Sequence, residues 1–258
     1  MKKLLAFLAL GLMVTGSAFA VGSSDPSIPM NNDGWIIGPD RADVLLISTT
    51  DVALNGALDQ LGVVYDYYAG EDFSGVDLSG YTHVFVAMDG GLVEGPSVSH
   101  GADFATAGGH LHFYGGTCYQ PFAMAVNDYL VQNDINNYCW QTVGGVPHST
   151  VTDPNNCLAI GLPSSYNFAD ISATYYSLRA TDPGIAVAAV NGDGVPHLFS
   201  KAIGAGSFDI CINSPYVSYY NNGSDFDWLK TVVNNMLNCG GPVAVQETTL
   251  GRVKALYR

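Results

Sequence analysis

Basic residues are scarce in this chain of 258 residues. It holds 9 Lys and Arg against 23 Asp and Glu, so its formal net charge at pH 7 is −14. The carboxylates are scattered singly rather than gathered in one run, which is typical of a solvated acidic surface. Because nucleic acids and anionic lipid surfaces attract basic proteins, this balance argues against both as partners.

Cysteine motifs for metal binding or redox exchange are also missing. No two cysteines are spaced as Cys-x-x-Cys, and no zinc-ligand spacing occurs. His110 and His112 lie two residues apart on an expected strand, so they face the same side. No third ligand accompanies them in the sequence. We therefore interpret them as buried structural histidines and predict no metal site and no cofactor.

Long hydrophobic runs are absent beyond the N-terminal region. Residues 1–20 have the pattern of a signal peptide: Lys2 and Lys3, an apolar run over 4–14, and a small-x-small cleavage site at 18–20. The apolar run is too short for a comfortable membrane span. We expect an exported mature chain without a membrane span, secreted or held in the cell envelope. An uncleaved anchor is the alternative.

The five cysteines all lie in the part expected to be exported. Export makes disulfides possible, and an odd number leaves at least one thiol unpaired or paired between chains. Cys139 and Cys157 flank a polar loop and form the first expected pair, and Cys211 with Cys239 forms the second. Cys118 would then remain a thiol.

The composition divides the chain into four segments. After the signal peptide, residues 21–41 are rich in Ser, Pro, Asn, Asp and Gly and predict a linker or an extended arm. Residues 42–238 form the expected folded domain, and 239–258 form a C-terminal tail. The last eight residues of the tail are basic, which is consistent with a sorting or attachment tag, or with a frayed helix turn.

Strand-like and helical patterns alternate through the first half of the domain. Strands are expected at 43–48, 63–68, 83–88 and 110–114, and helices at 52–61, 98–107 and 121–131. This alternation, with strands that are apolar nearly throughout, predicts an α/β fold with a parallel sheet covered on both faces.

The second half of the domain has a different pattern. Residues 133–175 are polar and irregular. Next come a hairpin turn at 191–194 between two strands, a strand over 206–212 and an amphipathic helix over 226–237.

Cys118 lies where a strand is expected to turn into a helix. The strand at 110–114 is followed by Gly115-Gly116-Thr117-Cys118 and then by an apolar run. The positive end of a helix dipole favours a thiolate, so Cys118 is the best candidate for a reactive group.

A second turn is expected at the same edge of the sheet. Asp89-Gly90-Gly91 ends another parallel strand, and ligands bind beyond the carboxyl ends of such strands. Asp89, Gly90, Gly91 and Tyr119 are therefore predicted ligand-binding residues. A tight turn without a ligand is the alternative for Asp89-Gly90-Gly91.

The order of elements over 42–238 resembles the class I glutamine amidotransferase-like fold. In that family the nucleophile lies in Gly-x-Cys-x-Gly, and here Gly116 and Cys118 match while Gln120 replaces the second glycine. The resemblance implies a flavodoxin-like, three-layer sandwich with a mostly parallel central sheet. Active members carry a His-Pro-Glu type segment after the last core strand. Residues 212–216, Ile-Asn-Ser-Pro-Tyr, lack both the histidine and the glutamate, which implies a lost amidotransferase mechanism.

Two functions remain open. The first is an exported, non-catalytic binding or structural protein whose partner, in the envelope or outside the cell, is unknown. The second is a secreted cysteine hydrolase of the amidase or peptidase type, with Cys118 as nucleophile and backbone N–H groups near Tyr119 as an oxyanion hole. His148 or His197 would be its base, which must lie within hydrogen-bond reach of the thiol. The missing family histidine and glutamate favour the first function.

Overall fold

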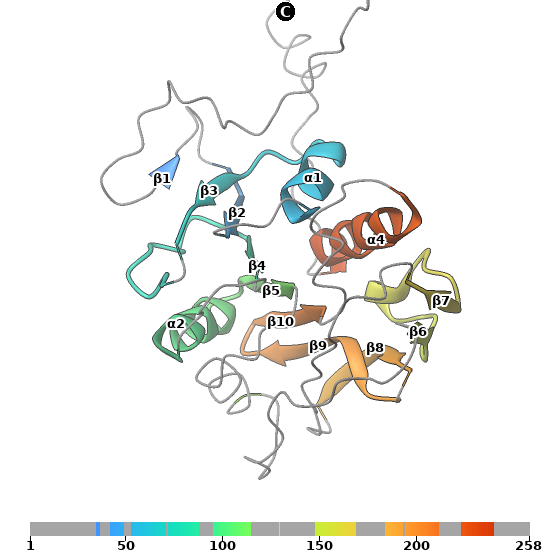
Figure 1. Ribbon diagram of the computed structural model, residues 1–258. Coiled ribbons are helices and arrows are strands. Elements are labelled where there is room, and N and C mark those ends of the chain that lie inside the picture. The colour runs from blue at the N-terminus through green and yellow to red at the C-terminus, as the bar shows by residue number, and fades with distance from the viewer. Residues whose placement is uncertain are drawn as a thin grey trace, which may run out of the picture.

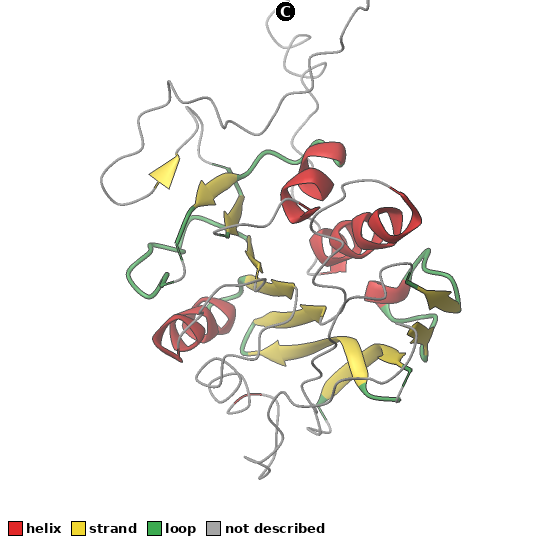
Figure 2. Cartoon of the chain, viewed as in Figure 1, coloured by secondary structure: helices red, strands yellow, loops and turns green. Residues whose placement is uncertain are grey.

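A computed structural model describes residues 35–36, 42–48, 53–70, 72–87, 95–114, 129, 148–168, 184–192, 194–211 and 223–239 of the chain. Its helices and strands are distinguished in Figure 2. The first half contains β1 (Trp35–Ile36), β2 (Val44–Ile47), α1 (Ala53–Gln60), β3 (Asp66–Tyr68), β4 (His83–Ala87), α2 (Gly95–Thr106) and β5 (His110–Tyr114). The second half contains β6 (His148–Val151), η1 (Cys157–Ala159), β7 (Ser165–Asn167), β8 (Ile185–Asn191), β9 (Pro196–Ile203), β10 (Gly206–Cys211) and α4 (Gly223–Cys239).

All ten described strands form one mixed sheet in the order β1-β3-β2-β4-β5-β10-β9-β8-β6-β7. The central strands β3, β2, β4, β5 and β10 run parallel to one another. β1 is antiparallel to β3 at one edge, and β9, β8, β6 and β7 continue the sheet antiparallel at the other. β1 lies within the segment that was expected to be a linker or an extended arm.

The predicted fold class, a three-layer, mostly parallel flavodoxin-like sandwich, is therefore wrong. Five of the nine strand pairings are antiparallel, and the described residues hold three α-helices against ten strands. Antiparallel neighbours need only a short turn, whereas parallel ones need a long crossover. β8, β9 and β10 are joined by such turns, so the alternation of strand and helix does not continue through the second half.

The segment predicted to be irregular contributes to this extension. Residues 133–175 include β6, η1 and β7. β6 and β7 are short, and their sequences, HSTV and SYN, lack an alternating apolar pattern. The hairpin predicted at 191–194 is confirmed by the antiparallel pairing of β8 with β9.

Local patterns placed the helices well. α1, α2 and α4 fall within three residues of their predicted bounds. Gly62 ends α1 as expected: its φ is +69°, and its N–H donates to the carbonyl of Asp59 at 3.0 Å. A residue with a side chain adopts this left-handed conformation only with strain, which is why glycine is favoured there. Of the helix predicted over 121–131, only Tyr129 lies within the described residues.

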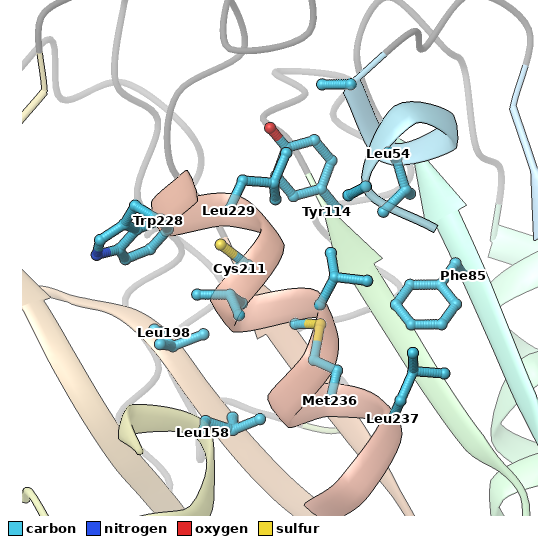
Figure 3. Packing of buried hydrophobic residues seen from close by; sticks show 14 of the residues in the cluster. Leu54, Phe85, Tyr114, Leu158, Leu198, Cys211, Trp228, Leu229, Met236 and Leu237 are labelled. Carbon is cyan, nitrogen blue, oxygen red and sulfur yellow. The ribbon is translucent and has the colours of Figure 1, made fainter. Parts of the chain in front are cut away.

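Helices pack against both faces of the parallel strands, α2 on one face and α1 with α4 on the other (Figure 1). Alternate side chains of β5 point to opposite faces of the sheet: Leu111 and Phe113 pack toward α2, and Tyr114 packs toward α4. Figure 3 shows the α4 side, where Leu229 and Met236 lie against residues of the sheet. Burying such side chains contributes about 1.5–3 kcal/mol each. None of the described helices combines the length and apolar character of a membrane span.

The one disulfide among the described residues joins Cys157 of η1 to Cys239 at the end of α4. The predicted pairs Cys139–Cys157 and Cys211–Cys239 are therefore wrong. α4 lies across the sheet so that its last residue meets η1, and Asn235 reinforces this contact by donating to the carbonyls of Leu158 and Ile160 at 2.9 and 2.8 Å. Cys211 is buried in β10 beneath the helix. Cys118 and Cys139 lie outside the described residues.

Candidate functional site

The predicted site lies beyond the carboxyl ends of β4 and β5, and the structure describes these two strands up to their last residues. Ala87 at the end of β4 pairs with Tyr114 at the end of β5. The two segments that carry the predicted residues thus leave the sheet from neighbouring strands. Those residues, Asp89, Gly90, Gly91, Cys118 and Tyr119, lie outside the described part of the chain, and their roles stay predictions.

His197, the first candidate base, is enclosed in the protein at the start of β9. Its side chain is 1% exposed, its Nε2 lies 2.8 Å from Ser149 Oγ, and its ring stacks on Trp228 with centroids 5.9 Å apart. Burial, and secondarily the nearby His148, lower the pKa of His197 to about 3. An imidazole with so low a pKa is a weak proton acceptor at neutral pH.

His148, the second candidate base, has both ring nitrogens engaged. Nδ1 lies 2.6 Å from Asn167 Oδ1, and Nε2 lies 2.8 Å from Thr150 Oγ1. β6, which carries it, is separated from β5 by β10, β9 and β8. At about 4.8 Å per strand step, the two strands lie roughly 19 Å apart. The structure thus places His148 in a polar cluster on β6, four strand steps from β5 and near the antiparallel edge of the sheet.

The surroundings of His197 form an aromatic cluster that joins β7, β9 and α4. Phe168 meets Trp228 edge to face at 4.9 Å, and Tyr166 meets Phe168 at 5.0 Å. The hydroxyl of Tyr166 donates to Asp225 Oδ1 at 2.5 Å. Edge-to-face pairs of this kind add about 0.5–1.5 kcal/mol beyond their buried area. The cluster holds α4 to the antiparallel part of the sheet.

Sequence reasoning missed a buried polar network in the centre of the sheet. His83 Nδ1 lies 2.8 Å from His112 Nε2, and His112 Nδ1 lies 3.0 Å from Asp209 Oδ2. The three residues come from β4, β5 and β10, and each is at most 2% exposed. The His112–Asp209 contact has the distance of an ion pair but not the alignment of a hydrogen bond. The sequence signal was the set of polar residues that interrupt otherwise apolar strands.

His110 and His112 face the same side of β5, as predicted, with ring centroids 6.5 Å apart. His112 is fully buried and His110 is half-buried. Across the described residues, no group of three or more ligating side chains is arranged to hold a metal ion.

His83 gives the network a marked pH sensitivity. Burial is the main cause that lowers its pKa, to about 3, and the neighbouring His112 and His110 lower it further. His83 is therefore neutral in the folded protein at pH values where an unfolded histidine, with a pKa near 6.5, takes up a proton. The same holds for His197.

We expect the free energy of unfolding to fall as the pH decreases below about 6.5. Each buried neutral histidine stabilises the fold fully above the unfolded pKa, and this contribution is lost toward the folded pKa, by about 1.4 kcal/mol per pH unit. His83 and His197 together predict a slope near 3 kcal/mol per unit between pH 6 and pH 4. Urea unfolding across this range measures it. His83→Gln should remove about half of the slope, and an unchanged slope would contradict the assignment.

Comparison with known proteins shows a similarity of fold. No family model matches the chain, and no curated protein matches it. A cytoplasmic protein from Salmonella typhimurium LT2 matches with a TM-score of 0.53 at 13% identity, over 75% of this chain and 98% of that one. A ThuA-like protein from Parabacteroides merdae matches with a TM-score of 0.52 at 14% identity, over 76% and 90% of the two chains.

A β-galactosidase from Rahnella sp. R3 also matches, with a TM-score of 0.52 at 16% identity. The alignment covers 79% of this chain but 31% of the enzyme, so this chain spans about a third of that protein. ThuA-like proteins have a glutamine amidotransferase-like fold, which confirms the predicted resemblance at that coarse level. Identities this low show the fold alone, and they assign no activity.

Proposed function

We propose that this chain is an exported, non-catalytic binding or structural protein that acts in the cell envelope or outside the cell. The observation that carries this proposal is the state of its two candidate bases. His197 is buried against Trp228 with a lowered pKa, and both nitrogens of His148 are engaged by neighbouring side chains.

A catalytic thiol needs a base that can approach it and accept its proton. Cys118 follows the last residue of β5 by four positions. Four residues span at most about 14 Å when fully extended, whereas β6 lies roughly 19 Å from β5. Cys118 could therefore approach His148 only if the chain ran almost straight across β10, β9 and β8 and the two side chains closed the remaining gap. His197 is nearer, two strands away from β5, but it would have to leave its buried contact with Ser149.

Two observations support export. The N-terminal 20 residues have the charge and apolar pattern of a signal peptide. Disulfides such as Cys157–Cys239 persist mainly in oxidising compartments outside the cytosol.

We further propose that the domain is amidotransferase-like and lacks the family's histidine and glutamate. The ThuA-like neighbour supports the first part. The segment 212–216, with neither residue, supports the second.

The test is the reactivity of Cys118 in the purified mature protein. We expect an iodoacetamide probe to label it no faster than it labels glutathione at neutral pH. His148→Gln and His197→Gln should change this rate by less than about twofold, because loss of a true general base costs about 10²–10⁴-fold. Cys118→Ala identifies the labelled position.

The competing hydrolase has a distinct signature. Rapid labelling of Cys118, together with hydrolysis of an amide or peptide substrate that is abolished by Cys118→Ala and by one of the two histidine variants, would overturn the non-catalytic role.

A further inference from the structure

The buried network continues from Asp209 toward the surface through two more side chains. Ser207 Oγ donates to Asp209 Oδ2 at 3.2 Å, and His110 Nδ1 lies 2.9 Å from the same hydroxyl. A hydroxyl has a single hydrogen, and Asp209 receives it. His110 must therefore donate from Nδ1 to Ser207. Ser207 thus donates directly to the carboxylate of Asp209, and His110 donates to the hydroxyl of Ser207.

This carboxylate forms part of the wall of a cavity of about 440 Å³. The polar part of the wall comes from neighbouring strands: His110 of β5, Ser207 and Asp209 of β10, and Ser200 of β9, which pairs with Asp209. The apolar part includes Leu158 and the Cys157–Cys239 disulfide. The cavity therefore lies between the sheet and the η1–α4 junction.

Among the described lining residues, Asp209 alone carries a carboxylate, and none is a lysine or an arginine. Its two side-chain contacts in the described part of the chain both use Oδ2. A carboxylate offers about four lone-pair sites, so Oδ1 keeps acceptor capacity for a ligand. Asp209 is only 2% exposed to solvent, so its carboxylate lies in the protein interior beside the cavity.

We propose that this cavity binds a small organic ammonium ion. Its N–H groups pair with Asp209 and the serine hydroxyls, and its hydrocarbon part lies against Leu158 and the disulfide. A buried charge gains most from an opposite charge with good hydrogen bonds. An anionic ligand would meet Asp209 without a compensating lysine or arginine among the described lining residues. The net charge of −14 also attracts cations to the protein.

The inference rests on the proposed binding role but can fail separately, because loss of amine binding would leave the reactivity of Cys118 unchanged. The probes are benzylammonium and its neutral analogue benzyl alcohol, titrated into the full mature chain by isothermal calorimetry. We expect benzylammonium to bind at least about tenfold more tightly, the size of one charge-assisted hydrogen bond. Equal affinity for the two probes, or no measurable binding of either, would overturn the proposal.

Two variants locate the site. Asp209→Asn should abolish the preference for the cation. Because a buried substitution can prevent folding, Ala186→Trp serves as the second variant: Ala186 is exposed and lines the cavity, so a large ring there should block it. We expect at least a tenfold loss of affinity.

Ala107→Trp, also exposed but next to α2, is the matched control and should bind normally. Equal binding by both tryptophan variants would place the amine elsewhere and overturn the assignment.

Discussion

Reduction of the Cys157–Cys239 disulfide should lower the free energy of unfolding by about 4.5 kcal/mol. The two cysteines are 82 residues apart in sequence. A cross-link that closes so long a loop restricts the unfolded chain strongly, and the chain-entropy relation gives about this value. The bridge also fastens η1 to the end of α4, so its loss should loosen the wall of the cavity first.

Urea unfolding with and without dithiothreitol measures this effect. The double variant Cys157→Ser, Cys239→Ser should resemble the reduced wild-type protein and should not respond to the reductant. This variant keeps Cys118, Cys139 and Cys211, so it also reports any effect of reductant on those residues. Wild-type stability that is unaffected by the reductant would contradict the prediction.

Trp228→Ala should cost about 3–5 kcal/mol, the usual range for removing a buried large aromatic ring. Trp228 is 5% exposed and contacts Phe168, Tyr166 and His197. The substitution would leave a cavity where α4 meets the antiparallel strands. Figure 3 shows the indole at one end of the α4 contact.

The measurement is urea unfolding at neutral pH. Trp228→Phe, which keeps most of the ring contacts, should lose less than half as much stability. Val64→Ala, at a position 66% exposed, is the control and should change stability by no more than about 0.5 kcal/mol. A loss for Trp228→Ala as small as that of the control would show that the aromatic cluster does not hold α4 in place.

Some features of the candidate site depend on residues adjacent in sequence, and others depend on residues that are distant in sequence. The turns at 89–91 and 115–119 were predicted from residues next to one another, and they lie outside the described residues. The environment of His148 and His197 could not be predicted, because their partners are remote in sequence. Ser149 is 48 residues from His197, and Trp228 meets the same ring from a different element.

The buried network shows this limit most clearly. His110 and His112 could be assigned to one face of a strand from their spacing alone. Ser207, which hydrogen-bonds to His110, lies 97 residues away, and it arrives there because β10 inserts between β5 and β9. The hydrophobic periodicity of the sequence does not predict the pairing of β10 with β5 or its register.

The sequence by itself determined the helices α1, α2 and α4, most of the described strands, the glycine that ends α1 and the β8–β9 hairpin. Each of these depends on residues within a few positions of one another, through side-chain periodicity and backbone preference. Only the tertiary structure decided the antiparallel extension of the sheet, the partner of Cys157 and the meeting of His83, His112 and Asp209. These depend on which distant surfaces bury the most apolar area together, and a local pattern does not record that choice.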